Sequence, residues 1–134
     1  MIKRNFKFIV EKTDSGYSAY GKSLSVYTTG DNLSELISNA NEALGLYFGE
    51  KEDNDFTEDI ELEMDLHQFF NYYRVINAKF LAQRIGMNES LLSQYVSGKK
   101  KPSSRQTLKI MTGIKEIGKE LNNLELFVKE KSHA

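Results

Sequence analysis

The chain has 134 residues, which suffice for one domain or two small ones, and its apolar content of 40% predicts a packed core. The absence of cysteine excludes disulfides and thiolate metal sites, and no apolar run approaches the roughly 18 residues of a membrane span. The N-terminus alternates in polarity, unlike the apolar core of a signal peptide, so we expect a soluble, cytoplasmic protein with no membrane partner.

The net charge of −1 conceals an acidic half and a basic half. Residues 1–73 hold 6 Lys and Arg against 14 Asp and Glu, whereas residues 74–134 hold 12 against 5. Halves of opposite charge indicate different partners, and a basic half is typical of modules that bind a phosphate backbone. A chance division is the alternative explanation.

The first half is predicted to begin with three short strands. Period-two alternation indicates a half-buried strand over residues 6–11, and the Asp-Ser-Gly turn signal at residues 14–16 leads into a second strand over residues 17–21. A third strand is expected over residues 24–28, before the Gly-Asp break.

A helix is expected next, from residue 33 to residue 47. Asn32 and Glu35 form a capping-box-like start, and apolar residues then recur at helical spacing. This apolar stripe, which should pack on the sheet, consists of Leu33, Leu36, Ile37, Ala40, Ala43, Leu44 and Tyr47.

The acidic segment over residues 50–59 is expected to be a solvated loop, and a fourth strand should follow over residues 60–66. The outward side chains of this strand are all carboxylates, namely Glu61, Glu63 and Asp65. They would discourage edge-to-edge self-pairing or receive a basic partner, and the two roles are compatible.

The second half is predicted to be all-helical, with about five helices, so that residues 1–65 and 66–134 form separate domains. A lead helix is expected over residues 66–76, followed by the two helices of the motif described next. After a loop over residues 98–102, Ser103 or Ser104 should cap a helix that carries Leu108 and Met111. A last helix is expected from residue 114 to residue 124, bent by nearby glycines.

Residues 78–97 (AKFLAQRIGMNESLLSQYVS) have the pattern of a helix-turn-helix, which lays its second helix in the major groove of DNA. Ala82 is small enough for a crossing helix, Gly86 lies where the turn requires positive φ, and Asn88 is a good N-cap. The residues expected to be buried are Leu81, Ile85, Met87, Leu92 and Tyr95. Lysines at 99–101 follow directly. An ordinary helical hairpin is the alternative.

The segment YTTGDNLSELISNANEALGLYFGE, residues 27–50, resembles the core of the HicB antitoxin family, in which a Gly-Asp turn leads into a helix of the form N-A-x-E-A-L-x-L-Y. The matching residues are Asn39, Ala40, Glu42, Ala43, Leu44, Leu46 and Tyr47. The second half resembles the Cro/CI-type repressor helix-turn-helix, including the trailing S-G-K-x-x-P at residues 97–102. Residues 21–31 depart from the family because they lack its frequent proline-rich turn, so contacts borrowed from that loop have no support.

The resemblance implies an α+β protein: a β-β-β-α-β unit similar to a partial ribonuclease H fold, followed by an all-α helix-turn-helix domain. It also implies an antitoxin that binds a HicA-like toxin, a small basic ribonuclease, blocks its active site and represses its own operon. Because such domains bind paired half-sites on double-stranded operator DNA, we expect a homodimer or higher homo-oligomer, with residues 117–127 of the last helix as a candidate contact.

Exposed side chains of the second motif helix are expected to read base edges, and the flanking ones to hold phosphates. Gln94 could read adenine, Ser90 could donate to a base or phosphate, and Glu89 could accept from a cytosine amino group although it would repel phosphate. The expected DNA contacts are Lys79, Gln83, Asn88, Glu89, Ser90, Ser93, Gln94, Lys99, Lys100, Lys101 and Arg105.

On the toxin side, carboxylates are expected to speed encounter and aromatic side chains to anchor the complex. The expected toxin contacts are Tyr17, Tyr20, Tyr27, Glu52, Asp53, Asp55, Phe56, Glu58, Asp59, Glu61, Glu63 and Asp65.

Catalysis is not expected. The carboxylates lie in a loop and on one strand face, and His67 has no second histidine at metal spacing, so we predict no catalytic residue, metal or cofactor. Two rival hypotheses are a stand-alone helix-turn-helix regulator, whose N-terminal module dimerises or senses a ligand, and a metal-dependent nuclease.

Overall fold

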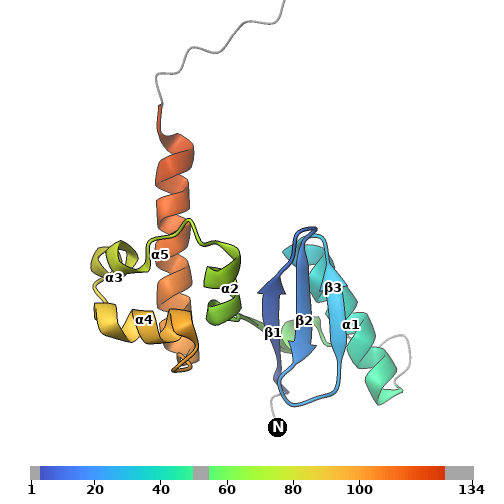
Figure 1. Ribbon diagram of the computed structural model, residues 1–134. Helices are drawn as coiled ribbons and strands as arrows, with labels where there is room; N and C mark the ends of the chain where they lie inside the picture. Colours follow the sequence, from blue (N-terminus) through green and yellow to red (C-terminus); the bar gives the residue numbers. More distant parts are fainter. Residues whose placement is uncertain (1–3, 50–54, 126–134) are drawn as a thin grey trace, which may run out of the picture.

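The computed structural model describes residues 4–49 and 55–125, which form an α+β structure with a four-stranded mixed sheet and five α-helices (Figure 1). The strands and the first helix make up one part of the molecule, and the remaining helices make up the other. No helix within these two ranges is long and apolar enough to cross a membrane.

The sheet is built from β1 to β4 in the order β3-β2-β1-β4. Its strands are β1 (Phe6–Lys12), β2 (Tyr17–Gly21), β3 (Tyr27–Gly30) and β4 (Ile60–Met64). β2 is antiparallel to both of its neighbours, whereas β4 runs parallel to β1 and therefore needs a crossover connection, which α1 provides. Backbone hydrogen bonds between Thr13 and Gly16 confirm the predicted turn between β1 and β2.

Two predicted strand boundaries were wrong. The third strand begins at Tyr27 rather than at residue 24, because Val26 donates to the carbonyl of Leu24 and so closes a tight turn before the strand. The fourth strand ends at Met64, since the side chain of Asp65 accepts from the amide of Gln68 and thereby caps the next helix.

Helix α1 (Leu33–Phe48) covers one face of the sheet (Figure 1). Asn32 caps its start by accepting from the amide of Glu35, as predicted, and Gly49 ends it in the left-handed conformation. The middle of the predicted apolar stripe is confirmed as core, whereas Leu33 and Tyr47 at its ends are each 49% exposed. The N-terminal core comprises Phe8, Val10, Ala19, Val26, Leu36, Ala40, Leu44 and Phe56.

The second core lies among four helices. These are α2 (Leu66–Tyr72), α3 (Ala78–Ile85), α4 (Glu89–Ser97) and α5 (Ser104–Asn123). Its buried residues are Leu66, Phe69, Phe70, Leu81, Ala82, Met87, Leu92, Tyr95 and Ile110. Ser103 caps α5 by accepting from the amide of Gln106, which decides between the two predicted serines.

The predicted helix count and one helix boundary in this half were wrong. The lead helix stops at Tyr72 instead of residue 76, and a single helix, α5, replaces the two that we expected, so residues 66–125 contain four helices rather than about five. A helical glycine costs only about 1 kcal/mol, and Ile114 and Ile117 continue the apolar stripe past Gly113. Packing also favours glycine at position 113, since a Cβ there would overlap Cγ2 of Ile85.

The two parts meet where β1 and β4 approach α2 and α5. Met64 packs against both cores, and the amide of Asp65 donates to the carbonyl of Val10. The side chain of Gln68 accepts from the Lys12 amide at 2.8 Å and donates to the Lys12 carbonyl at 2.7 Å. These backbone contacts fix α2 against the end of β1.

Candidate functional site

Helices α3 and α4 are joined by a short turn whose details follow the sequence prediction. Gly86 ends α3 with a φ of 70°, the left-handed conformation expected of it, and the amide of Met87 donates to the carbonyl of Ala82. The side chain of Asn88 accepts from the amide of Leu91 at 3.0 Å and so caps α4. Ala82 is fully buried, which allows the two helices to pack closely.

Burial separates α4 into an inner and an outer side. Leu92 and Tyr95 face the core, together with Met87 of the turn, as predicted. The predicted DNA-contact residues are exposed, with the exception of the half-buried Gln94. Helix α4 therefore presents Glu89, Ser90 and Ser93 on its open side.

Gln83 and Glu89 contact each other across the turn. The Gln83 side-chain amide donates to the Glu89 carboxylate at 2.6 Å. This bond links the exposed side of α3 to the first turn of α4, and it gives Glu89 a local partner in addition to the favourable N-terminal end of its helix.

The loop from Gly98 to Lys101, here called the lysine loop, connects α4 to α5. Gly98 has a φ of 81°, and the amide of Lys100 donates to the carbonyl of Gln94 at 3.2 Å. All three lysine side chains are exposed, and no carboxylate within residues 4–49 and 55–125 pairs with them. The loop thus adds positive charge directly beside the end of α4.

The sheet face opposite α1 carries two of the predicted aromatic toxin contacts. Tyr20 of β2 lies opposite Tyr27 of β3 on one side and Ile9 of β1 on the other, and the row ends at Glu63 of β4. Tyr20 and Tyr27 are 41% and 66% exposed. Burial raises the pKa of the Tyr20 hydroxyl, and nearby negative charges, of which Asp65 contributes more than Glu11, raise it further.

Most of the described acidic candidates have local partners. The ammonium of Lys7 lies 3.7 Å from Glu61 and 3.6 Å from Glu63, and Arg4 pairs with Asp59 at 2.9 Å. The Asp55 carboxylate accepts from the hydroxyl and the amide of Thr57, and these bonds lower its pKa. Glu58 is exposed. Glu52 and Asp53 lie outside the described residues.

One of the predicted aromatic anchors was wrong, and another is half-buried. Phe56 is only 1% exposed, because its ring packs into the N-terminal core and its amide donates to Asn41 of α1. Tyr17 packs against the same core on the α1 side of the sheet. Phe56 therefore cannot serve as an exposed anchor, whereas Tyr17 is half-buried and lies on the other face of the sheet from Tyr20 and Tyr27.

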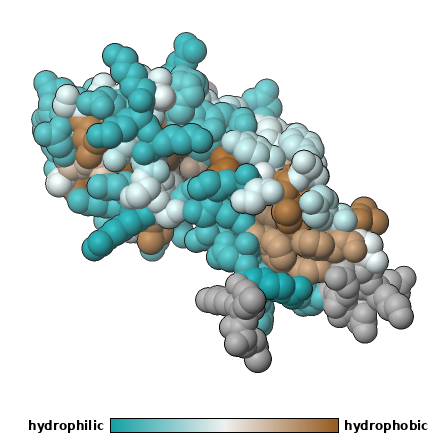
Figure 2. All heavy atoms as spheres, turned by 90° about the horizontal axis from the view of Figure 1, so that it is seen from below, coloured by the Kyte–Doolittle hydropathy of each residue, from teal (hydrophilic) through white to brown (hydrophobic). Residues whose placement is uncertain are grey.

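An apolar surface that the sequence did not predict lies at one end of the N-terminal part. Figure 2, which views the molecule from below, shows hydrophobic surface gathered at this end, whereas the other end is mostly hydrophilic. The exposed apolar side chains of α1 include Leu46 (78%) and Phe48 (42%), and the Phe48 ring lies 5.7 Å from those of Phe6 and Phe56. Helical spacing predicted only the buried stripe of α1. It therefore did not identify Leu46 and Phe48, whose side chains are exposed on the last turn of the helix.

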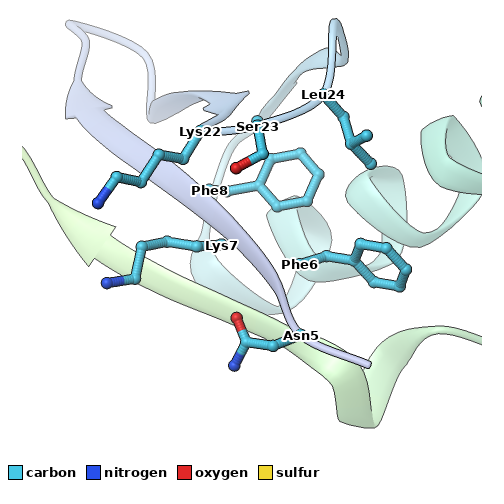
Figure 3. Close-up of a pocket in the computed structure, with 8 residues that line it drawn as sticks. Asn5, Phe6, Lys7, Phe8, Lys22, Ser23 and Leu24 are labelled. Carbon is cyan, nitrogen blue, oxygen red and sulfur yellow. The ribbon is translucent and has the colours of Figure 1, made fainter. Parts of the chain in front are cut away.

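A cavity of about 390 Å³ lies at the start of β1, and Figure 3 shows the side chains that line it. Phe6, Phe8 and Leu24 line its side toward α1, and the side chains of Lys7 and Lys22 extend to the other side of the sheet. No predicted site residue lines it.

A larger groove, of about 500 Å³, lies between the outer sheet face and the lysine loop. Ile9, Tyr20 and Lys22 line the sheet side, and Lys100 and Lys101 line the helical side. The groove could not be predicted from the sequence because its two walls come from separate halves of the chain.

The described residues contain no cluster of three or more His, Asp or Glu side chains arranged to hold a metal ion. A comparison of the chain with models of protein families, with curated proteins and with solved structures finds no match.

Proposed function

We propose that the protein is an antitoxin that neutralises a small basic ribonuclease through its sheet and represses its own operon through a helix-turn-helix formed by α3 and α4. The observation that carries this proposal is the exposed polar side of α4, whose opposite side is buried, beside three exposed lysines that pair with no carboxylate within residues 4–49 and 55–125. The antitoxin role itself rests on the family resemblance of residues 27–50 and on the exposed tyrosines of the outer sheet face.

The DNA-binding part of the proposal assigns α4 to the major groove. Ser90 and Ser93 would face base edges, and Gln94 would read adenine from the margin of the same helix. Phosphates would be held by Lys79, Arg105 and the lysine loop, so added salt should weaken the complex steeply. Glu89 is held by Gln83, which keeps its carboxylate at the helix end.

The toxin-binding part assigns the partner to the outer sheet face. Tyr20 and Tyr27 form an exposed aromatic pair there, and aromatic side chains are common hot spots of protein interfaces. Asp65 lies near Tyr20, and its negative charge would attract a basic partner.

A homodimer would place two copies of α4 on successive half-sites. Ile110, Ile114, Ile117, Leu121 and Leu124 follow the alternating four- and three-residue spacing of a coiled-coil seam. The first three pack in the protein's own core, whereas Leu121 and Leu124 are 65% and 56% exposed, and α5 extends beyond the other helices (Figure 1). We assign the exposed end of this seam to a second copy.

The groove beside the lysine loop favours one alternative function, a regulator whose DNA affinity responds to a small ligand. Its volume of about 500 Å³ falls within the usual range for small-molecule sites, roughly 300–1,000 Å³. A ligand there would touch both the sheet and the lysine loop, and so could alter DNA binding without any protein partner.

Co-expression separates the two functions. The chain would be produced with the product of a neighbouring short reading frame that encodes a small basic protein, and growth and co-purification would be measured. The antitoxin proposal predicts that the small protein arrests growth alone and is bound and neutralised by this chain. If no neighbouring product is toxic while the chain still binds its promoter, the regulator is correct instead.

A further inference from the structure

His67 contacts the C-terminal end of α4 from the second residue of α2. Its Nδ1 lies 2.8 Å from the carbonyl oxygen of Val96, and its Nε2 lies 3.4 Å from the side-chain nitrogen of Asn71. Because a carbonyl oxygen only accepts, Nδ1 carries the proton and donates. His67 thus satisfies one of the carbonyls that a helix leaves without an intrahelical partner at its end.

The same imidazole ring lies against Gly98, the first residue of the lysine loop. A Cβ at this position would stand 3.1 Å from Nδ1 and 3.2 Å from Cγ of His67. Gly98 also has a φ of 81°, which L side chains rarely adopt. The ring and the left-handed turn therefore fix together the direction in which the chain leaves α4.

Helix α2 is a fixed support for this contact. Asp65 caps it, and Gln68 holds it to the backbone of Lys12 in β1 through two hydrogen bonds of 2.7 and 2.8 Å. His67 stands between these two residues in the chain, so its ring is held from the sheet side and reaches across to the lysine loop.

We propose that His67 is a positioning residue for DNA binding: it holds the lysine loop in the path that places its three ammonium groups beside α4. This inference rests on the proposed DNA-binding function. Without the imidazole, the Val96 carbonyl loses its hydrogen-bond donor, and Gly98 loses its contact with the ring. The lysines of the loop then adopt more conformations. Fewer of them then engage phosphates at once.

The test uses the full chain and a fluorescent promoter duplex, with affinity measured over a range of salt concentrations. His67→Ala should weaken binding about tenfold and reduce the salt dependence by about one phosphate contact, or roughly 0.9 in the log–log slope. His67→Asn should restore most of the affinity and of the salt dependence, because the side-chain nitrogen of asparagine can replace Nδ1 as the donor to the Val96 carbonyl. The matched control is Asn71→Ala, which removes only the 3.4 Å contact and should leave affinity and slope unchanged.

A second readout requires no DNA. Trypsin cleavage after Lys99 and Lys100 should be faster in His67→Ala than in the native chain, and His67→Asn should return it toward the native rate. If His67→Ala does not fold, His67→Phe, which keeps a ring against Gly98 and removes only the donor, should still raise the cleavage rate and weaken DNA binding.

The outcomes separate the two proposals. If the native chain does not bind its promoter, the proposed function fails, and the trypsin rates alone still decide whether His67 orders the loop. If the native chain binds and folded His67 variants match it in affinity, slope and cleavage rate, the positioning role is overturned.

Discussion

The side chains of Gln83 and Glu89 are joined by a 2.6 Å hydrogen bond that connects α3 to the first turn of α4. This bond places a carboxylate where the proposed function requires a phosphate backbone to approach. The arrangement lets charge and geometry at this position be altered separately, since glutamine can replace glutamate in the same bond.

Glu89→Gln should therefore tighten binding to any duplex. The substitution removes repulsion of about 1 kcal/mol from the phosphates, or about fivefold in Kd, and keeps an acceptor for Gln83. Fluorescence anisotropy with promoter and unrelated duplexes would measure the change. Glu42→Gln, the same charge change on exposed α1, serves as control, and an equal gain from both variants would show that only net charge matters.

Gln94→Ala combined with Lys100→Ala should abolish promoter binding and leave toxin binding intact. The loss of one base contact and one phosphate contact is expected to weaken the DNA complex by about 2–4 kcal/mol. Gel shift and toxin co-purification would be compared with Lys119→Ala on exposed α5. Loss of both functions in the double variant would argue against separate surfaces.

Tyr27→Ala should weaken the toxin complex by about 2 kcal/mol if the partner sits on the outer sheet face. Tyr47→Ala, which truncates another half-exposed tyrosine on the α1 side, is the matched control. Calorimetric titration with the purified toxin would give both affinities. A larger loss of affinity in Tyr47→Ala than in Tyr27→Ala would indicate that the toxin binds the α1 side of the sheet instead.

Gly113→Ala and Gly118→Ala should shift stability in opposite directions. Alanine at residue 118 meets no atom within 4 Å and should stabilise α5 by up to about 1 kcal/mol through helix propensity. Alanine at residue 113 would overlap the β-branched Ile85 and should destabilise the fold by about 1–3 kcal/mol. Urea unfolding of both variants would test this, and a stabilised Gly113→Ala variant would contradict the packing reason given for that glycine.

The hydroxyl of Tyr72 donates to Asp14 at 2.9 Å and links α2 to the turn between β1 and β2. This hydrogen bond raises the pKa of Tyr72, and burial and the charge of Asp14 add to the effect. Since the folded-state pKa exceeds the unfolded value, the contact stabilises fully below the ordinary tyrosine pKa of about 10 and is lost as pH rises through the raised value. In Asp14→Asn, NMR titration should find the Tyr72 pKa lower than in the native chain; an unchanged value would rule out this bond in solution.

Local features could be predicted from the sequence because a few neighbouring residues determine them. Asn32 and Asn88 cap their helices through amides three residues ahead, and Gly86 takes positive φ because no Cβ opposes it. The buried faces of α1 and α4 likewise follow from helical periodicity, which each segment carries by itself.

Features that depend on distant segments could not be predicted in this way. Phe56 lies in an acidic stretch, and contacts with distant segments bring it into the core: its amide donates to Asn41 of α1, and its ring packs against Phe6 of β1 and Phe48 of α1. Lys7 forms ion pairs with two carboxylates of β4 because β4 pairs parallel with β1, a register that alternation alone does not reveal. The groove beside the lysine loop likewise requires the placement of both halves.

Gln68 completes β1 in the way that a residue of an adjacent strand would, by bonding both backbone groups of Lys12. Dividing the chain for separate expression at residue 65 would leave one corner of the sheet without its hydrogen-bonding partner and would detach the helical fragment from its support. A recombinant sheet fragment should therefore extend through Tyr72, even though that segment belongs by sequence to the other half.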